Sequence, residues 1–261
     1  MMKKVGFAGI LFAASIIFSG CSTSSPTSEA SAKEIYEWRI YTLKGDSLCG
    51  NDTVLDAYLS ETFIPAYNRL GVTIGAFTPY VKEPAASRYL LLVYPSLAAY
   101  HKAKTDVWKD QTFRNAAQPY FDTTAATPLY SNFESFLCEA FDVMPQMRRP
   151  DKERTLFEYR IYHSPNEEAN QRKIKMFNNG EINIFDRTGV NSVCYGAILA
   201  GSRMPALIYL TWYRDDTTRN EAWGKFRTDE EWVKMRALPE YANATDETKS
   251  ILLSPLPYSQ F

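Results

Sequence analysis

The sequence predicts an α+β fold made of two copies of a β-α-β-β-α-β unit, and two observations carry that prediction. The first is a hexapeptide that occurs twice, as YEWRIY at 36–41 and as FEYRIY at 157–162. The second is that the similarity continues at a similar offset, because FIPAYNRLGV at 63–72 matches EINIFDRTGV at 181–190. A period this long is typical of a duplicated domain and too long for a solenoid repeat.

The first half contains strand and helix patterns in a fixed order. YEWRIYTL, from residue 36, alternates large side chains with period two and predicts a strand. Apolar residues spaced by four then predict a helix, which Pro65 bends and Gly71 ends. Two strands, VTIGAFTPY and RYLLLVYP, follow, and a helical region from Leu97 to about Tyr120 precedes the closing strand YSNFESFLCEAF.

The second half repeats this order. Its predicted elements are the strand TLFEYRIYH, a helix from about Glu167 to Thr188, the strands VNSVCYGAIL and ALIYLTWYR, a helical stretch ending near Leu238 and a last strand in SILLSPL. The order β-α-β-β-α-β is that of the ferredoxin-like fold, in which two helices cover one face of a four-stranded antiparallel sheet. The predicted repeats are therefore residues 34–140 and 154–261, joined by a Pro-containing linker at 141–153.

The amino terminus has the pattern of a secretion signal. Lys3 and Lys4 precede the apolar run VGFAGILFAASIIF, which is too short to span a bilayer comfortably and ends in FSGC at Cys21. This ending resembles a bacterial lipobox, which implies a signal peptide at 1–20 and lipidation of Cys21. The alternatives are an ordinary signal peptide or a buried apolar segment with an incidental cysteine. Residues 21–33 are rich in Ser, Thr and Ala and predict a flexible tether, so we expect a lipid-anchored protein of the bacterial cell envelope, on the periplasmic or surface face of a membrane.

Several features, all but the last of which recur in both halves, resemble the NIPSNAP family. They are the paired E-x-R-x-Y strands, the R-x-G-V at the end of each first helix, the aromatic third strand, the Trp-bearing second helical region and the ending LLSPLPYSQF. The resemblance covers nearly all of the chain after residue 34. It implies membership of the dimeric α/β-barrel superfamily, in which two ferredoxin-like units pack sheet to sheet. A tandem repeat would supply both units and form one α/β barrel within the chain.

Composition excludes several classes of function. The formal net charge of -1 gives no footprint for a nucleic-acid partner. Two histidines and the absence of CxxC or HxxxH motifs argue against a metal site, and no cofactor is expected. Apart from Cys21, the cysteines are Cys49, Cys138 and Cys194, of which Cys49 and Cys138 could form a disulfide, although burial as free thiols is the simpler expectation.

The repeated strand supplies the candidate ligand-binding residues. Period-two geometry separates an apolar face from a polar face, and the polar residues are Glu37, Arg39, Tyr41, Glu158, Arg160 and Tyr162. We expect this polar face to line the space between the two sheets, with each Arg paired to its Glu because unpaired buried charges are costly. Two interpretations stay open: the pairs fix the register of the sheet, or they orient an anionic or carbonyl-bearing ligand.

Catalysis has weaker support in the sequence. His163, just after the second copy of the strand, and His101, on a predicted helix, could add acid-base chemistry, but neither has a nucleophile at informative spacing, and we expect both to be solvated. The sequence therefore favours a lipoprotein that binds a small organic ligand between its sheets. An alternative is a cofactor-independent oxygenase or isomerase of the superfamily that the resemblance implies, and a second alternative is a protein-interaction scaffold. Homo-oligomerisation is left open.

Overall fold

The computed structural model describes residue 1 and residues 32–44, 51–81 and 87–261. The predicted signal peptide, most of the predicted tether, Cys21 and Cys49 lie outside these described residues. Within the described ranges, no helix is both long and apolar enough to cross a membrane. The architecture below concerns the compact unit that begins at Ser31.

Both halves of the chain contain the expected elements in the expected order. The first half consists of β1 (Ile35–Leu43), α1 (Asn51–Ala57), π-helical η2 (Tyr58–Phe63), α2 (Ile64–Asn68), β2 (Thr73–Pro79), β3 (Ser87–Tyr94), α3 (Leu97–Asp106), 3-10 helical η3 (Val107–Lys109), α4 (Gln111–Ala116), α5 (Gln118–Phe121) and β4 (Tyr130–Ala140). The second half consists of β5 (Leu156–His163), α6 (Glu167–Met176), π-helical η4 (Phe177–Glu181), α7 (Ile182–Thr188), β6 (Asn191–Ala200), β7 (Ala206–Tyr213), α8 (Asp216–Thr228), α9 (Glu230–Arg236), 3-10 helical η5 (Pro239–Tyr241) and β8 (Glu247–Pro255).

Local chemistry accounts for the helix ends. Ser96, Asn166 and Asp215 each accept a backbone N–H of the first turn of the helix that follows, which is the standard role of an N-cap. Gly189 ends α7 in the left-handed region at φ 88°, as a C-cap glycine does. Pro65 lies in the first turn of α2, directly after η2, so the expected interruption of the first long helix takes the form of a π-helical segment.

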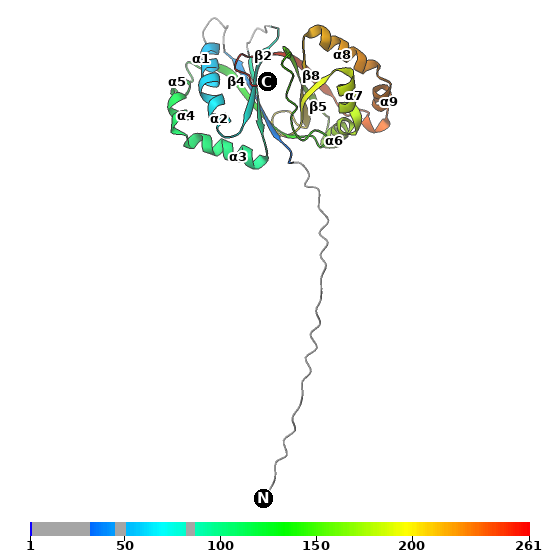
Figure 1. Cartoon of the computed structure of the whole chain (residues 1–261), viewed down its shortest axis with the longest axis horizontal. Helices are drawn as coiled ribbons and strands as arrows, with labels where there is room; N and C mark the ends of the chain where they lie inside the picture. Colours follow the sequence, from blue (N-terminus) through cyan, green and yellow to red (C-terminus); the bar gives the residue numbers. More distant parts are fainter. Residues whose placement is uncertain (2–31, 45–50, 82–86) are drawn as a thin grey trace. The chain divides into compact units, whose positions relative to one another are not determined.

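The eight strands form a closed barrel in the order β1-β3-β2-β8-β5-β7-β6-β4, and every paired neighbour is antiparallel. The strands of each half lie together, and two seams close the barrel. One seam is the pairing of β2 with β8, and the other is the pairing of β4 with β6. The helices of the first half cover one side of the barrel, and those of the second half cover the other (Figure 1).

The barrel interior is apolar and holds residues from both halves. Trp38 of β1 contacts Tyr159 of β5 with ring centroids 4.8 Å apart, and Phe77 of β2 contacts Phe157 of β5 at 4.9 Å. Two further cores lie outside the barrel, one under the helices of each half. Both faces of β1 and β5 are therefore almost entirely buried.

The sequence divides the residues of β1 and β5 correctly between two faces, but the prediction that the polar face lies inside the barrel is wrong. Tyr36, Trp38 and Ile40 point into the barrel, so Glu37, Arg39 and Tyr41 point outward under the helices. In β5, Phe157, Tyr159 and Ile161 belong to the interior, and Glu158, Arg160 and Tyr162 face the helices of the second half. Because helices carry charged and polar side chains, the outer layer offers partners to buried Glu and Arg that the aromatic interior does not.

Candidate functional site

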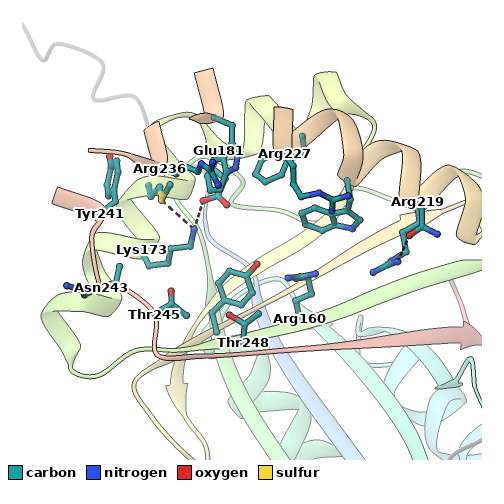
Figure 2. Close-up of a pocket in the computed structure, with 17 residues that line it drawn as sticks. Arg160, Lys173, Glu181, Arg219, Arg227, Arg236, Tyr241, Asn243, Thr245 and Thr248 are labelled. Atoms are coloured by element: carbon teal, nitrogen blue, oxygen red, sulfur yellow. Dashed lines mark hydrogen bonds and ion pairs between the residues drawn. The ribbon is translucent and has the colours of Figure 1, made fainter. Parts of the chain in front are cut away.

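The main cavity lies on the outer face of the second half, between strands β5 and β8 and the helices that cover them. Its volume is about 640 Å³. Figure 2 shows residues of the strands rising from one side and residues of the helices descending from the other. The lining residues are Arg160, Tyr162, Lys173, Met176, Glu181, Arg219, Asn220, Trp223, Phe226, Arg227, Trp232, Arg236, Tyr241, Asn243, Ala244, Thr245 and Thr248.

Arg160 forms part of the cavity floor and has an unsatisfied donor. Its Nη1 donates to Glu158 Oε1 at 2.7 Å. Its Nε is buried and has no hydrogen-bond partner among the described residues. The guanidinium carbon also lies 4.7 Å from the ring centroid of Trp223, which orients the plane of the group. A buried N–H without a partner is costly, so an incoming acceptor that reached Nε would be stabilised there.

Glu158 holds the arginines of the cavity in place. Its carboxylate is fully buried and accepts hydrogen bonds from Arg219 at 2.9 and 3.1 Å, from Trp223 Nε1 at 2.7 Å and from Ser250 at 2.5 Å, in addition to Arg160. Burial opposes ionisation, but the hydrogen bond from Arg219, the charge of Arg160 and the hydrogen bond from Ser250 outweigh it and lower the pKa of Glu158. An ionised Glu158 therefore fixes two guanidinium groups from different elements.

Lys173 and Glu181 form a buried ion pair in the cavity. Lys173 Nζ lies 2.7 Å from Glu181 Oε2, and the two side chains are 8% and 3% exposed. The ammonium is also 4.5 Å from the ring centroid of Phe177. Burial raises the pKa of Glu181, and the charge of Lys173 opposes that rise. Glu181 closes η4, where the chain kinks between α6 and α7 because Gly180, at φ 141°, leaves the helical region.

The cavity has an excess of positive charge. Five basic side chains line it, those of Arg160, Lys173, Arg219, Arg227 and Arg236, whereas Glu181 is the acidic residue of the lining. Arg227 of α8 and Arg236 of α9 are exposed and form no ion pair within the described ranges. Aromatic side chains of Tyr162, Trp223, Phe226, Trp232 and Tyr241 supply the apolar walls. This combination suits an organic anion with a flat, apolar body.

The corresponding region of the first half leaves much less space. Arg39 donates Nε and Nη2 to the two oxygens of Glu37 at 2.8 and 3.1 Å, so its pairing is bidentate. The rings of Phe63 and Tyr67 lie 4.9 and 5.7 Å from the Arg39 guanidinium carbon. A cavity of about 190 Å³ remains there, bordered by Arg39, Tyr41 and six aromatic residues. The predicted Arg–Glu pairs are thus confirmed in both halves, but of the seven ligand-binding candidates, which include His163, only Arg160 and Tyr162 line the large cavity.

The two histidines differ from each other, and only His163 departs from the expectation. His101 is exposed on α3, as predicted. His163 is buried rather than solvated, with 6% of its surface exposed, and it shares the interior face of β5 with Tyr159 and Ile161. It is therefore the one candidate residue that lies between the sheets.

Cys138 and Cys194 are buried free thiols, and the described residues contain no cluster of three His, Cys, Asp or Glu suited to a metal ion.

Sequence reasoning missed most of the cavity lining. Lys173, Glu181, Arg219, Arg227 and Arg236 come from helices, and no motif marks them. One signal was present, because Arg219, Trp223 and Arg227 are spaced by four and so share one face of α8. The pattern does not reveal that this face covers Arg160, which lies 59 residues earlier in the chain.

Comparisons with known proteins match the second half of the chain to a family and most of the chain to a fold. Residues 157–260 match the NIPSNAP family. Two solved structures of similar fold are putative monooxygenases, one from Fusobacterium nucleatum (TM-score 0.55, 13% identity, covering 86% of this chain and 93% of that chain) and one from Lactobacillus acidophilus (0.53, 8%, 85% and 94%). A third is an anthrone oxidase-like protein (TM-score 0.53, 10% identity, 87% and 93%). At these identities the likeness concerns the fold alone. A search of curated proteins finds no match.

Proposed function

The chain carries a NIPSNAP domain in residues 157–260, and we propose that this domain binds a small organic anion in the cavity between its sheet and its helices. The observation that carries the proposal is the charge of the lining, in which five basic side chains accompany one carboxylate. This proposal keeps the ligand-binding function expected from the sequence and moves its site from the barrel interior to the outer face of β5.

Charge pairing supports an anionic ligand. Glu158 offsets part of the charge of Arg160 and Arg219, and Glu181 offsets that of Lys173. Arg227 and Arg236 have no such partner within the described ranges. Their charge raises the local concentration of anions at the mouth of the cavity, and Arg160 forms part of its floor.

The hydrogen-bond donors and the aromatic walls of the cavity indicate which kind of ligand it would bind. A guanidinium presents a planar set of donors that matches a carboxylate, sulfonate or phosphate. Rings of Trp223, Phe226 and Trp232 favour an aromatic or otherwise flat body between the charged groups. The ligand class is therefore an aromatic or unsaturated acid.

The proposal is tested by isothermal titration calorimetry with 2-naphthoate and its neutral methyl ester. We expect the acid to bind and the ester to bind at least about tenfold more weakly. Arg227→Gln combined with Arg236→Gln should weaken binding of the acid and reduce its salt dependence. Arg149→Gln is the matched control, because Arg149 is exposed, has no ion pair within the described ranges and lies outside the cavity.

Arg160→Lys tests the floor of the cavity. Lysine keeps the positive charge that Glu158 needs but lacks the planar set of guanidinium donors, so the variant should fold and bind 2-naphthoate more weakly. Equal affinity for the acid and the ester in the unmodified protein would rule out the proposal. So would an acid affinity that none of the three arginine changes alters.

An enzyme is the second candidate, and the Lys173–Glu181 pair favours it. A carboxyl group with a raised pKa next to an ammonium group in a partly apolar cavity can exchange a proton with a bound substrate. The structural neighbours described as monooxygenases make oxygen-dependent turnover a reasonable assay. Oxygen consumption and product formation by mass spectrometry would support this candidate if both disappear in Glu181→Gln, and binding without turnover would favour a binding protein.

We further propose that the barrel is a tandem of two NIPSNAP-like repeats, residues 34–140 and 154–261, with residues 141–153 as their linker. The supporting observation is that each half contributes four strands in equivalent order, β4-β1-β3-β2 and β8-β5-β7-β6. The buried networks also correspond, since Ser135 and Ser250 bond to Glu37 and Glu158, and Lys104 and Arg219 approach the same two carboxylates.

The proposed location remains the bacterial cell envelope, with residues 1–20 as signal peptide, residues 21–33 as tether and a lipid on Cys21. The support is the order of basic residues, apolar run and Ser-Gly-Cys. An anchored binding protein of this kind would meet organic anions outside the cytoplasm.

A further inference from the structure

A second cavity opens at one end of the barrel interior. Its volume is about 300 Å³. The strands present alternate residues to it, with apolar and aromatic side chains on the floor and polar ones at the rim. The floor includes Ile40, Tyr89, Phe136, Tyr159, Ile161 and Ile251. The interior farther along β5 is filled, because the rings of Phe77, Phe157 and Phe261 pack together there.

His163 lies at the rim with one ring nitrogen already engaged. Its Nδ1 lies 2.8 Å from the backbone carbonyl oxygen of Arg203. A carbonyl oxygen only accepts, so Nδ1 carries the proton of this hydrogen bond. In the neutral imidazole Nε2 is then an acceptor, and it has no hydrogen bond within the described residues.

The position of the His163 ring is fixed by its surroundings. The backbone carbonyl of His163 accepts from Asp246 N at 3.0 Å, and the next residue, Ser164, donates its N–H to Pro205 O at 3.0 Å. These contacts tie the end of β5 both to the turn that carries Arg203 and to the start of β8. The Nε2 acceptor is therefore held at a constant place beside the apolar floor.

The charges at this rim are balanced, in contrast to those of the first cavity. Arg203 and Lys249 both pair with Glu247, the latter at 3.6 Å. Glu134 accepts from Ser202 at 3.1 Å. Two basic and two acidic side chains thus offset one another, and no excess charge selects an anion or a cation.

From these contacts we propose that the barrel mouth is a second binding site, for a small neutral aromatic molecule whose hydroxyl donates a hydrogen bond to Nε2 of His163. The apolar, aromatic floor accommodates the ring, and the balanced rim disfavours a net charge. The hydroxyl would donate to Nε2 the hydrogen bond that no described residue provides. This inference does not depend on the proposed anion site, since the two cavities share no lining residue.

The test uses 2-naphthol, with naphthalene and 2-naphthoate as comparisons, on protein labelled with ¹⁵N histidine at about pH 8. The chain has two histidines, so exposed His101 is an internal reference. We expect 2-naphthol to shift the Nε2 resonance of His163 towards that of a hydrogen-bonded acceptor and to leave His101 unchanged. Naphthalene should bind at least about tenfold more weakly.

Two variants separate this site from the anion site. His163→Asn retains an N–H that can reach the Arg203 carbonyl but lacks Nε2, and it should weaken 2-naphthol binding about tenfold or more while leaving 2-naphthoate binding unchanged. Ile251→Trp places a larger ring in the floor and should also abolish 2-naphthol binding. The Arg227→Gln and Arg236→Gln double variant should bind 2-naphthol normally. An unmoved Nε2 resonance at saturating 2-naphthol, or equal affinity for naphthalene, would overturn the proposal.

Discussion

Arg39 and Arg160 occupy matching positions on β1 and β5, two residues after a buried glutamate, but only Arg39 is fully satisfied. Arg39 donates both Nε and Nη2 to Glu37, whereas Arg160 donates Nη1 to Glu158 and leaves a buried Nε without a partner among the described residues. Aromatic rings cover Arg39, and a cavity of about 640 Å³ faces Arg160. The same Arg–Glu pair is therefore packed under aromatic rings in the first half and faces a cavity in the second half.

Arg39→Ala should destabilise the protein more than Arg160→Ala does. Removal of Arg39 leaves the buried carboxylate of Glu37 with Tyr94 at 2.8 Å and the longer contacts of Lys104 and Ser135 at 3.3 Å, at a cost of about 3–5 kcal/mol. Glu158 keeps Arg219, Trp223 and Ser250 after loss of Arg160, so that change should cost about 1–2 kcal/mol. Denaturant unfolding of both variants, with Arg149→Ala as an exposed control, measures the difference. Equal losses in the free energy of unfolding would show that the two Arg–Glu pairs contribute equally to stability.

Glu37 should contribute an acid-dependent part of the stability. Burial opposes its ionisation, but the charge and hydrogen bonds of Arg39, with Lys104 and Tyr94, lower its pKa from 4.5 to about 2. The folded state therefore keeps this carboxylate ionised at pH values where the unfolded chain binds a proton. The stabilisation is present above pH 4.5 and is lost as the pH falls towards 2, and it amounts to about 3 kcal/mol.

Unfolding free energies measured between neutral and acidic pH check this prediction. Glu37→Gln should flatten the acid limb of the curve by about that amount, although the variant is less stable at neutral pH. Glu221→Gln is the matched control, because Glu221 is exposed and has no ion pair within the described ranges. An unchanged acid limb in Glu37→Gln would mean that other carboxylates control acid unfolding.

Lys173→Met should destabilise the protein increasingly as the pH rises. Burial already raises the pKa of Glu181 above 4.5, and Lys173 opposes that rise, so loss of the ammonium raises it further. The folded variant then takes up a proton that the unfolded chain releases above pH 4.5, and the cost grows with pH until the folded pKa is reached. We expect a loss of about 3 kcal/mol near neutral pH and a smaller loss near pH 5.

A second change in the same background identifies the cause. Lys173→Met combined with Glu181→Leu replaces the buried pair by apolar groups and should recover most of the lost stability together with its pH dependence. If the double variant is as unstable as Lys173→Met, the lysine acts through packing on Phe177 and not through its charge.

The order of elements was predictable from the sequence because it depends on local pattern. Period-two strands, capping residues and helix-ending glycines are each encoded within a few residues, and the strand and helix ranges agree closely with expectation. The pairing of Arg39 with Glu37 was equally local, since the two residues share a face of one strand.

The direction of that face was not predictable from β1 or β5 alone. Alternation assigns Trp38 and Arg39 to opposite faces but does not say which is interior, because helices bury the outer face as thoroughly as the barrel buries the inner one. The deciding contacts are non-local: Trp223 donates to Glu158 across 65 residues, and Lys104 approaches Glu37 across 67. The cavity was missed for the same reason, since its charges come from helices packed on the sheet.

Cys21→Ser should abolish lipid attachment if the proposed anchor is correct. Lipoprotein processing requires the thiol of this residue, whereas an ordinary signal peptide would be cleaved irrespective of it. Metabolic labelling with a radioactive fatty acid, followed by membrane fractionation, tests the change. The unmodified protein should carry label and sediment with membranes, and the variant should do neither. Label retained on the Ser variant would contradict the assignment of Cys21.

Gly196 and Gly224 should respond in opposite ways to the same added methyl group. Gly196 lies on β6 beside the seam with β4, where a Cβ would sit 2.6 Å from the Cβ of Cys138. Gly196→Ala should therefore overpack the barrel and cost about 1–3 kcal/mol. Gly224 lies within α8, and a Cβ there would meet no atom within 4 Å, so Gly224→Ala should stabilise the protein by about 0.5–1 kcal/mol through helix propensity.

A compensating change makes the seam prediction specific. Since the clash is with the Cβ of Cys138, Cys138→Ala should not relieve it. Cys138→Gly combined with Gly196→Ala should relieve it, because β4 then loses the Cβ that meets the new one on β6. The swapped variant should recover at least half of the stability lost in Gly196→Ala, less the cost of a glycine in a strand. Equal recovery by Cys138→Ala would show that the sulfur, and not the Cβ contact, limits the packing between β4 and β6.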